Sequence, residues 1–219
     1  MNKIYYVIIV FILIVAIFNV IAERYVKNEV KEKTDLRQIP VEDRIEGDGG
    51  LEDILSFVTN KANDNDIKII PSFGTLLGLE REKEIIKHDY DIDLFLFEDD
   101  WDKLKKILEK EERFHFEDRK ILWHRMFKIS DKKTGLSSDF FILYENKGSV
   151  TQDIFLTYTG SGIHDGKLIL SEMGRKKYTK EDILPLKKTS TKYGELYFPN
   201  KPENLLVSWY GEDWETPRL

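Results

Sequence analysis

The chain has 219 residues, of which 41% are hydrophobic and 12% aromatic, enough to bury the core of one catalytic-size domain. A formal net charge of −6 argues against nucleic-acid binding through general electrostatics. There is no cysteine and the four histidines lack metal-site spacing, so disulfides and thiolate zinc sites are excluded and any metal site must be built from oxygen ligands.

The N-terminal segment is apolar over residues 4–22 except for Asn19. As a helix it would be roughly 28 Å long, close to the ~30 Å hydrocarbon core of a bilayer. We therefore predict that residues 1–22 form one uncleaved transmembrane signal-anchor; a signal peptide cleaved after Ala22 is the alternative. More basic residues follow the span than precede it, which slightly favours a cytoplasmic C-terminus.

Residues 23–50 are charged without a sustained apolar face and are predicted to be a juxtamembrane stalk, which leaves residues 51–219 as the catalytic domain. Within that domain, hydrophobic spacing predicts helices and strands in alternation, an α/β or α+β pattern. Helices are expected at 51–62 and 101–108, and strands at 67–70, 91–97, 121–129, 138–143 and 151–158.

The run Gly74-Thr75-Leu76-Leu77-Gly78 follows the first strand, and we expect a turn at residues 72–74 with a helix opening at Thr75. A helix that opens after a glycine turn has free N–H groups, and its dipole favours anions. We interpret the run as a phosphate site, in which Gly74 permits close backbone approach and the Thr75 hydroxyl adds a hydrogen bond. Further candidates for phosphate contact are Arg81, Lys87 and Arg125.

Three carboxylates follow in the run Asp89-Tyr90-Asp91-Ile92-Asp93. Successive side chains of a strand point to opposite faces, so Asp89, Asp91 and Asp93 are expected to share one face. Carboxylates at this spacing repel one another unless a cation lies between them, and such hard oxygen ligands suit Mg²⁺ or Mn²⁺. These residues therefore predict metal-assisted chemistry on a phosphate-bearing substrate.

The acidic run Glu98-Asp99-Asp100 lies between the expected strand and the expected helix at 101–108. Carboxylates placed there cap free N–H groups and interact favourably with the helix dipole. We therefore predict that this run is structural.

A further acid is expected to complete the site, either as a metal ligand or as the base for an attacking hydroxyl. Asp139 is the best candidate because it is a lone acid in Ser138-Asp139-Phe140-Phe141-Ile142-Leu143, and a carboxylate is rarely placed in such an apolar strand without a partner. A cap at the start of the strand is the alternative role. Asp153 is the second choice for the partner acid.

Two blocks of sequence carry a family resemblance. Gly74-Thr75-Leu76-Leu77-Gly78 with Asp89-Tyr90-Asp91-Ile92-Asp93 resembles the signature of the LicD/fukutin family of phosphotransferases, and the Asp-Tyr-Asp-Ile-Asp form is closer to the fukutin-related members than to the bacterial ones. Tyr210-Gly211-Glu212-Asp213-Trp214 is similar to the C-terminal pattern of the same family. The resemblance runs from about residue 51 to residue 217, nearly all of the predicted domain.

The resemblance implies a nucleotidyltransferase-like fold of the polymerase β type, with a mixed sheet and flanking helices. It also implies transfer of a substituted phosphate, such as phosphocholine or ribitol phosphate, from a CDP-linked donor to a glycan, with Mg²⁺ or Mn²⁺ as cofactor. An N-terminal anchor suits the eukaryotic members, which would place the domain in the Golgi or secretory-pathway lumen. Carried over by position, the metal carboxylates would be Asp89, Asp91, Asp93 and Asp139, the last three of them catalytic, and the donor-binding residues Gly74, Thr75 and Arg81.

Two other functions stay open. Asp91-Ile92-Asp93 also suits a metal-dependent glycosyltransferase that binds Mn²⁺ and a nucleotide-sugar diphosphate, although the upstream glycine turn favours phosphotransfer. A catalytically inactive, membrane-anchored binding protein of the same fold is the second alternative. The intact acids Asp91, Asp93 and Asp139 argue against it, because no structural need explains three clustered carboxylates.

Overall fold

The structure is a computed structural model that describes residues 50–87, 89–121, 124–154, 162–164, 167–169 and 174–217, with the backbone alone described at 119–121, 124, 153–154 and within 162–175. The predicted signal-anchor at residues 1–22 lies outside the described part, as does the predicted stalk apart from Gly50. No helix among the described residues is long and apolar enough to cross a membrane. The signal-anchor therefore stays a prediction.

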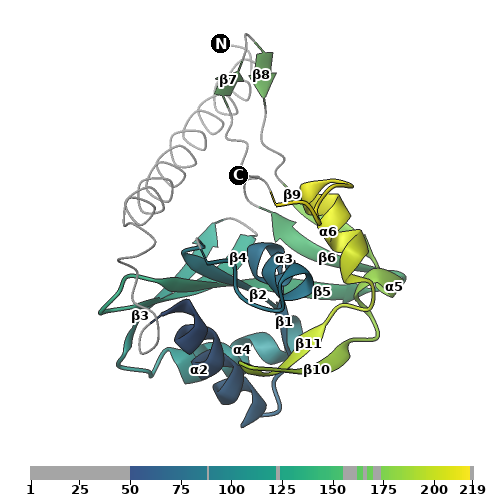
Figure 1. Cartoon of the computed structure of the whole chain (residues 1–219). Helices are drawn as coiled ribbons and strands as arrows, with labels where there is room; N and C mark the ends of the chain where they lie inside the picture. The colour runs from purple at the N-terminus through teal and green to yellow at the C-terminus, as the bar shows by residue number, and fades with distance from the viewer. Residues whose placement is uncertain are drawn as a thin grey trace, which may run out of the picture. The chain divides into compact units, whose positions relative to one another are not determined.

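A mixed sheet of seven strands forms the centre of the domain (Figure 1). Its strands are β1 (Ile69–Pro71), β2 (Asp91–Phe97), β3 (Phe114–Ile121), β4 (His124–Asp131), β5 (Ser137–Asn146), β6 (Ser149–Ile154) and β9 (Gly174–Thr179). The order is β1-β2-β5-β4-β3, with β6 paired to β5 and β9 to β6. Only β2 and β5 run parallel among these pairs. The predicted mixed sheet with flanking helices is confirmed.

Helices lie on both faces of this sheet (Figure 1). One face packs against α2 (Leu51–Asn63) and α4 (Glu98–Leu108), and the other carries α3 (Phe73–Arg81) and α6 (Pro202–Tyr210). The remaining described elements are α5 (Lys180–Ile183), the hairpin of β10 (Lys187–Thr191) and β11 (Gly194–Phe198), and the hairpin of β7 (Gly162–His164) and β8 (Lys167–Ile169).

Successive side chains of β2 point to opposite faces of the sheet, one of which packs into the core while the other carries the acids. Ile92, Leu94 and Leu96 point to the face covered by α2 and α4 and are completely buried. On the same face, the ring of Phe127 stacks on that of Phe140 at 4.3 Å and contacts Trp101 of α4 at 4.8 Å. The opposite face therefore receives Asp91 and Asp93.

The acidic run at residues 98–100 is the first turn of α4 and does not precede the helix as predicted. The N-cap residue is Phe97, without a side-chain cap. Asp100 accepts hydrogen bonds from the Lys68 N–H at 3.1 Å and from the Lys103 ammonium at 3.0 Å. The run is structural, but it acts through the helix dipole and through these contacts.

Candidate metal centre

Three carboxylates from two neighbouring parallel strands meet on the face of the sheet that carries α3 and α6. Asp91 and Asp93 belong to β2, and Asp93 stands beside Asp139 of β5 in the parallel register. One oxygen from each of the three carboxylates lies within 4.8 Å of the others. Asp91 and Asp139 are only 6% and 2% exposed. The structure thus brings the predicted partner acid to the predicted pair, whereas the side chain of Asp153 lies outside the described part.

This group of acids has the chemistry and the spacing of a site for a hard divalent cation. Oxygens bound to one Mg²⁺ lie about 2.1 Å from the ion, and hence up to about 4.2 Å apart, so small side-chain rotations suffice to form the site. Buried carboxylates this close repel one another strongly unless a positive charge compensates them. The donor set consists of oxygen alone, which suits Mg²⁺ or Mn²⁺.

Asp89 does not belong to this group of described acids. β2 begins at Asp91, so Asp89 precedes the strand. Its carboxylate lies against the first turn of α3, where a Cβ on Gly74 would be 2.7 Å from Asp89 Oδ2. Asp89 thus lies on the side of the sheet that carries α3, as Asp91 and Asp93 do, although it precedes the strand. Its assignment as a metal ligand stays a prediction.

The start of α3 fixes the backbone of the metal-binding strand. The helix begins at Phe73, ahead of the predicted start at Thr75. The Thr75 hydroxyl is buried and accepts a hydrogen bond from the Asp93 N–H at 2.9 Å, while the Ser72 N–H donates to the Asp93 carbonyl at 3.0 Å. Thr75 therefore positions Asp93, and its contact with a donor phosphate stays a prediction.

The two glycines of the run at 74–78 face the segment that leads from α3 to β2. A Cβ on Gly78 would lie 2.5 Å from the Glu84 carbonyl oxygen and 3.0 Å from the Ile86 nitrogen. At Gly74 it would meet Asp89. Because only glycine permits such close approach, the spacing of the run is explained by packing as well as by any phosphate contact.

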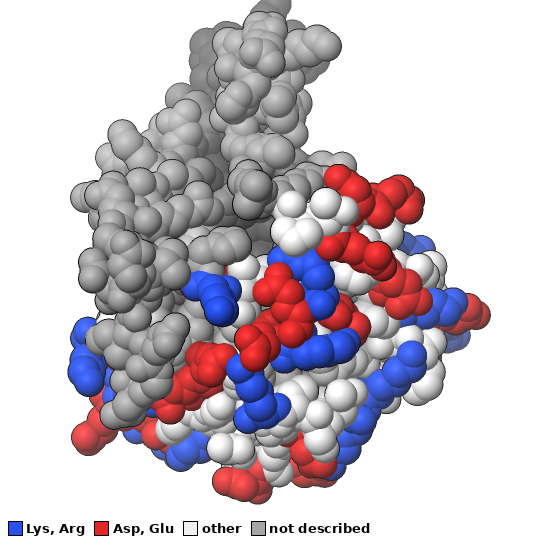
Figure 2. Space-filling model, viewed as in Figure 1, with Lys and Arg blue, Asp and Glu red and all other residues white. Residues whose placement is uncertain are grey.

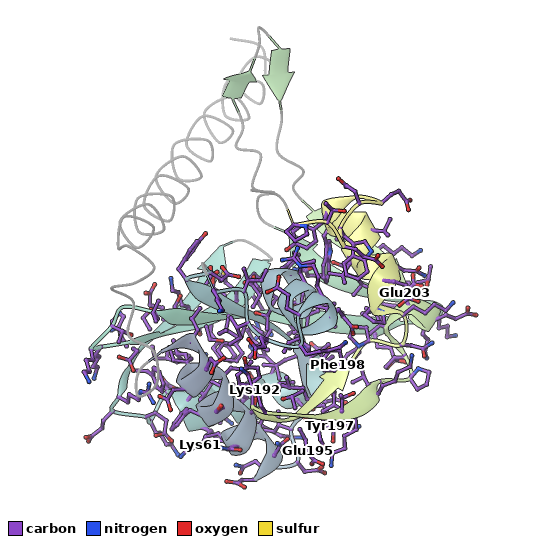
Figure 3. All side chains as sticks on the ribbon, viewed as in Figure 1. Lys61, Lys192, Glu195, Tyr197, Phe198 and Glu203 are labelled. Atoms are coloured by element: carbon purple, nitrogen blue, oxygen red, sulfur yellow. The ribbon has the colours of Figure 1, made fainter. Side chains whose placement is uncertain are left out.

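Ion pairs and a tyrosine hold the same segment from its other side. Lys192, labelled in Figure 3, lies 2.8 Å from Glu52 and 3.1 Å from Glu84. The Tyr193 hydroxyl donates to Glu52 at 2.9 Å and accepts a hydrogen bond from the Ile85 N–H at 3.2 Å. Acidic and basic side chains are interspersed over this side of the molecule (Figure 2). The segment before β2 is therefore fixed on two sides.

Two of the three basic residues predicted as phosphate contacts lie away from the carboxylates. Arg81 lies in the last turn of α3, roughly 12 Å from its first turn, and its guanidinium binds Glu82 Oε1 at 2.6 and 3.0 Å. Arg125 lies on the opposite face of the sheet, 5.7 Å from the ring of Trp101, so the prediction for Arg125 is wrong. Lys87 is exposed on the segment before β2, and its role stays a prediction, like that of Arg81.

Sequence reasoning did not assign Tyr210, which the structure places near the acids. Burial, and then the charges of Asp93, Asp89 and Asp91, raise the pKa of the Tyr210 phenol above its ordinary value. The phenol therefore stays protonated and offers an O–H donor to an acidic site. Gly211 ends α6 with a φ of 93°, which favours glycine. In the sequence, the pair Tyr210-Gly211 in the C-terminal block was the signal that could have identified this tyrosine.

An aromatic cluster holds α3 and α6 beside the carboxylates. Trp209 packs on Phe73 at 4.6 Å and donates a hydrogen bond through Nε1 to the Tyr178 hydroxyl at 3.2 Å. Phe73 also contacts Phe95 and Phe141, each at 5.5 Å. The φ of Phe73 is 43°, a conformation that a bulky residue rarely adopts and that the surrounding rings maintain.

The comparison with protein families agrees with this geometry. The model of the LicD/FKTN/FKRP nucleotidyltransferase domain matches residues 66–201. The chain belongs to the LicD family. This match confirms the resemblance read from residues 74–78 and 89–93. The family is of phosphotransferase type. A search among curated proteins finds no significant match.

The LicD domain match includes all three clustered acids and the whole of α3. It ends ahead of Tyr210, so the tyrosine is connected to the site by the packing of α6 and not by the matched range.

Proposed function

We propose that this LicD-family protein is a metal-dependent transferase that moves a substituted phosphate, of the phosphocholine or ribitol phosphate type, from a CDP-linked donor to a glycan acceptor. The group formed by Asp91, Asp93 and Asp139 supports this proposal most directly, because three carboxylate oxygens lie within 4.8 Å on a rigid sheet. The start of α3 lies beside this group, and its first N–H groups, which have no partner within the helix, favour an anion.

Each part of the site has a proposed task in this reaction. A divalent ion bound to the three acids would neutralise phosphate charge and polarise the phosphoryl group. Asp139 stands level with Asp93 in the sheet, which favours a ligand role over that of a base. Gly74 and Thr75 place the first turn of α3 against donor phosphate, and the Tyr210 hydroxyl donates a hydrogen bond to a phosphate or acceptor oxygen.

The donor class can be tested by thermal unfolding of the full-length protein in detergent. We expect CDP to raise the melting temperature in Mg²⁺ or Mn²⁺ and to have no effect in EDTA, because the ion joins the acids to the phosphates. UDP serves as the comparison for the glycosyltransferase alternative. Equal stabilisation by CDP in EDTA would contradict a metal-bridged donor, and a response to UDP alone would favour the glycosyltransferase. Release of CMP from CDP-linked donors tests the transfer itself.

We also propose that residues 1–22 anchor the protein in a membrane as a single span. The apolar run at residues 4–22 supports this, since it has the length of the hydrocarbon core. If the chain is eukaryotic, analogy with the eukaryotic members places the domain in the Golgi or secretory-pathway lumen, whereas the basic residues after the span favour a cytoplasmic C-terminus. We expect the protein to stay in the membrane pellet after alkaline carbonate extraction. Its release with a new N-terminus near Glu23 would establish a cleaved signal peptide instead.

A further inference from the structure

A buried lysine stands next to the clustered acids. Lys128 of β4 is 2% exposed and ranks among the largest fully buried side chains of the described residues. It lies directly opposite Asp139 in the antiparallel pairing of β4 with β5, and opposite Glu117 in the pairing of β3 with β4. With Asp93 beside Asp139, four charged residues therefore form one row across four neighbouring strands.

The row places Lys128 between Glu117 and Asp139, on the face of the sheet that carries the acids. Directly opposed residues of an antiparallel pair have Cβ atoms about 4.5–5.5 Å apart, well within reach of a lysine side chain. A buried ammonium is strongly unfavourable unless acids surround it. The same face of β4 carries Met126, also buried, so an apolar side chain fits this strand. Packing alone therefore does not explain the lysine at position 128, and its charge has to be considered.

The charges of the neighbouring acids explain why a lysine is present at this position. Asp91, Asp93 and Asp139 carry three negative charges, and Asp89, whose charge also acts on Tyr210, adds a fourth nearby. The positive charge of Lys128 offsets one of them, which reduces the negative charge that a bound divalent ion has to balance. Glu117 adds little to this local balance, because its side chain is 32% exposed and solvent screens it.

We propose that Lys128 is the fixed counter-cation of the metal centre. It holds Asp139 and its neighbours together before an ion binds, and it lowers the negative charge that a bound divalent ion has to balance. The proposal rests on the proposed function, since it concerns the same three acids, and it makes Lys128 a positioning residue that needs no contact with the donor.

Two measurable consequences follow from this role. In a variant without the lysine charge, the acids repel one another more strongly when no metal is bound. A bound ion should therefore stabilise this variant more than it stabilises the wild type. The lysine also repels the incoming ion, so its removal should strengthen Mn²⁺ binding by at least about fivefold. A lysine with only a packing role would lower stability equally with and without metal.

The test compares Lys128→Met with Lys128→Arg and Ile129→Ala in the full-length protein. Ile129 is the matched control, because it is fully buried on the same strand and faces away from the acids. Melting temperatures are measured in EDTA and in Mn²⁺, and Mn²⁺ affinity is measured by calorimetry. We expect Lys128→Met to melt lower in EDTA and to gain more from Mn²⁺ than the wild type. Ile129→Ala should melt lower in both conditions with an unchanged gain, and Lys128→Arg should keep the wild-type gain.

An equal or smaller Mn²⁺ gain in Lys128→Met, or weaker Mn²⁺ binding, would overturn the counter-cation role while leaving the metal centre intact. A wild type that does not respond to Mn²⁺ would instead contradict the metal centre and the proposed function together. Lys128→Gln repeats the test if Lys128→Met does not fold in EDTA. If neither neutral variant folds even in Mn²⁺, the proposal is wrong, because a bound ion should replace the missing charge.

Discussion

Asp91→Asn and Asp93→Asn are each expected to abolish both the metal-dependent stabilisation by CDP and the release of CMP. Each substitution removes one anionic ligand from a group of three and leaves a neutral amide of the same size. Metal-ion catalysis contributes several kcal/mol of transition-state stabilisation, so we expect a rate loss of at least about 10³-fold. Calorimetry with Mn²⁺ and a CMP-release assay measure the two effects separately.

Asp100→Asn is the matched control for these substitutions. It makes the same chemical change in the first turn of α4, where Asp100 contacts Lys68 and Lys103 and has no place in the acid group. We expect near-normal Mn²⁺ binding and turnover in this variant. In EDTA, the melting temperature of Asp91→Asn should not fall, because repulsion among the acids is reduced. Folded Asp91→Asn and Asp93→Asn proteins with near-normal activity would refute the assignment of the site.

Asp139→Asn decides between the two roles that its sequence position left open. As a ligand, Asp139 should be needed for Mn²⁺ binding and turnover alike, so both should fall together. As a base, it should leave metal-dependent CDP binding intact while turnover drops by about 10²–10⁴-fold. The parallel register of Asp93 and Asp139 leads us to expect the first result.

The parts of the fold that follow hydrophobic periodicity were predictable. β2 matches its predicted range because acidic and apolar residues alternate at its start and an apolar run continues it. α2 extends the predicted range by a single residue because its apolar positions keep helical spacing. Asp139 was identifiable because an acid in an apolar strand needs a partner. What pattern alone could not supply was the pairing of β2 with β5, which brings Asp139 to Asp93.

The side-chain positions of several residues follow only from strand pairing and packing. Lys128 carries no distinguishing signal in the sequence, and only the register of β4 with β5 shows that Asp139 lies opposite it. Arg125 shares the parity of Phe127 and therefore faces α4. Asp89 lies ahead of β2, so strand alternation alone could not place its side chain.

Several elements gave too weak a local signal to be assigned. β3 carries charged side chains at half of its positions, and the strand expected to begin at residue 121 is in fact β4, which begins at His124. β10 is almost wholly exposed, so it has no apolar face to detect. Their formation depends on pairing with β4 and β11, which lies beyond what local periodicity encodes.

Gly78→Ala adds a single methyl group and is expected to lower the free energy of unfolding substantially. Alanine favours a helix over glycine by about 1 kcal/mol, so the substitution would stabilise α3 if space were available. The new Cβ would instead lie 2.5 Å from the Glu84 carbonyl oxygen, and a backbone atom cannot rotate away. Overpacking of this kind costs about 1–3 kcal/mol, and here the Ile86 backbone must move as well. We expect a net loss of about 2 kcal/mol in urea unfolding.

Gly74→Ala makes the same chemical change one turn earlier and should behave differently. Its Cβ would meet the Asp89 carboxylate at 2.7 Å, and a side chain can rotate away, so we expect stability within about 1 kcal/mol of the wild type. The displaced carboxylate changes the surroundings of the α3 N-terminus, so metal-dependent stabilisation by CDP should weaken. Stability at or above the wild type in Gly78→Ala would disprove the close packing. Unchanged CDP binding in Gly74→Ala would mean that neither Gly74 nor Asp89 takes part in donor binding, and that the run at 74–78 serves packing alone.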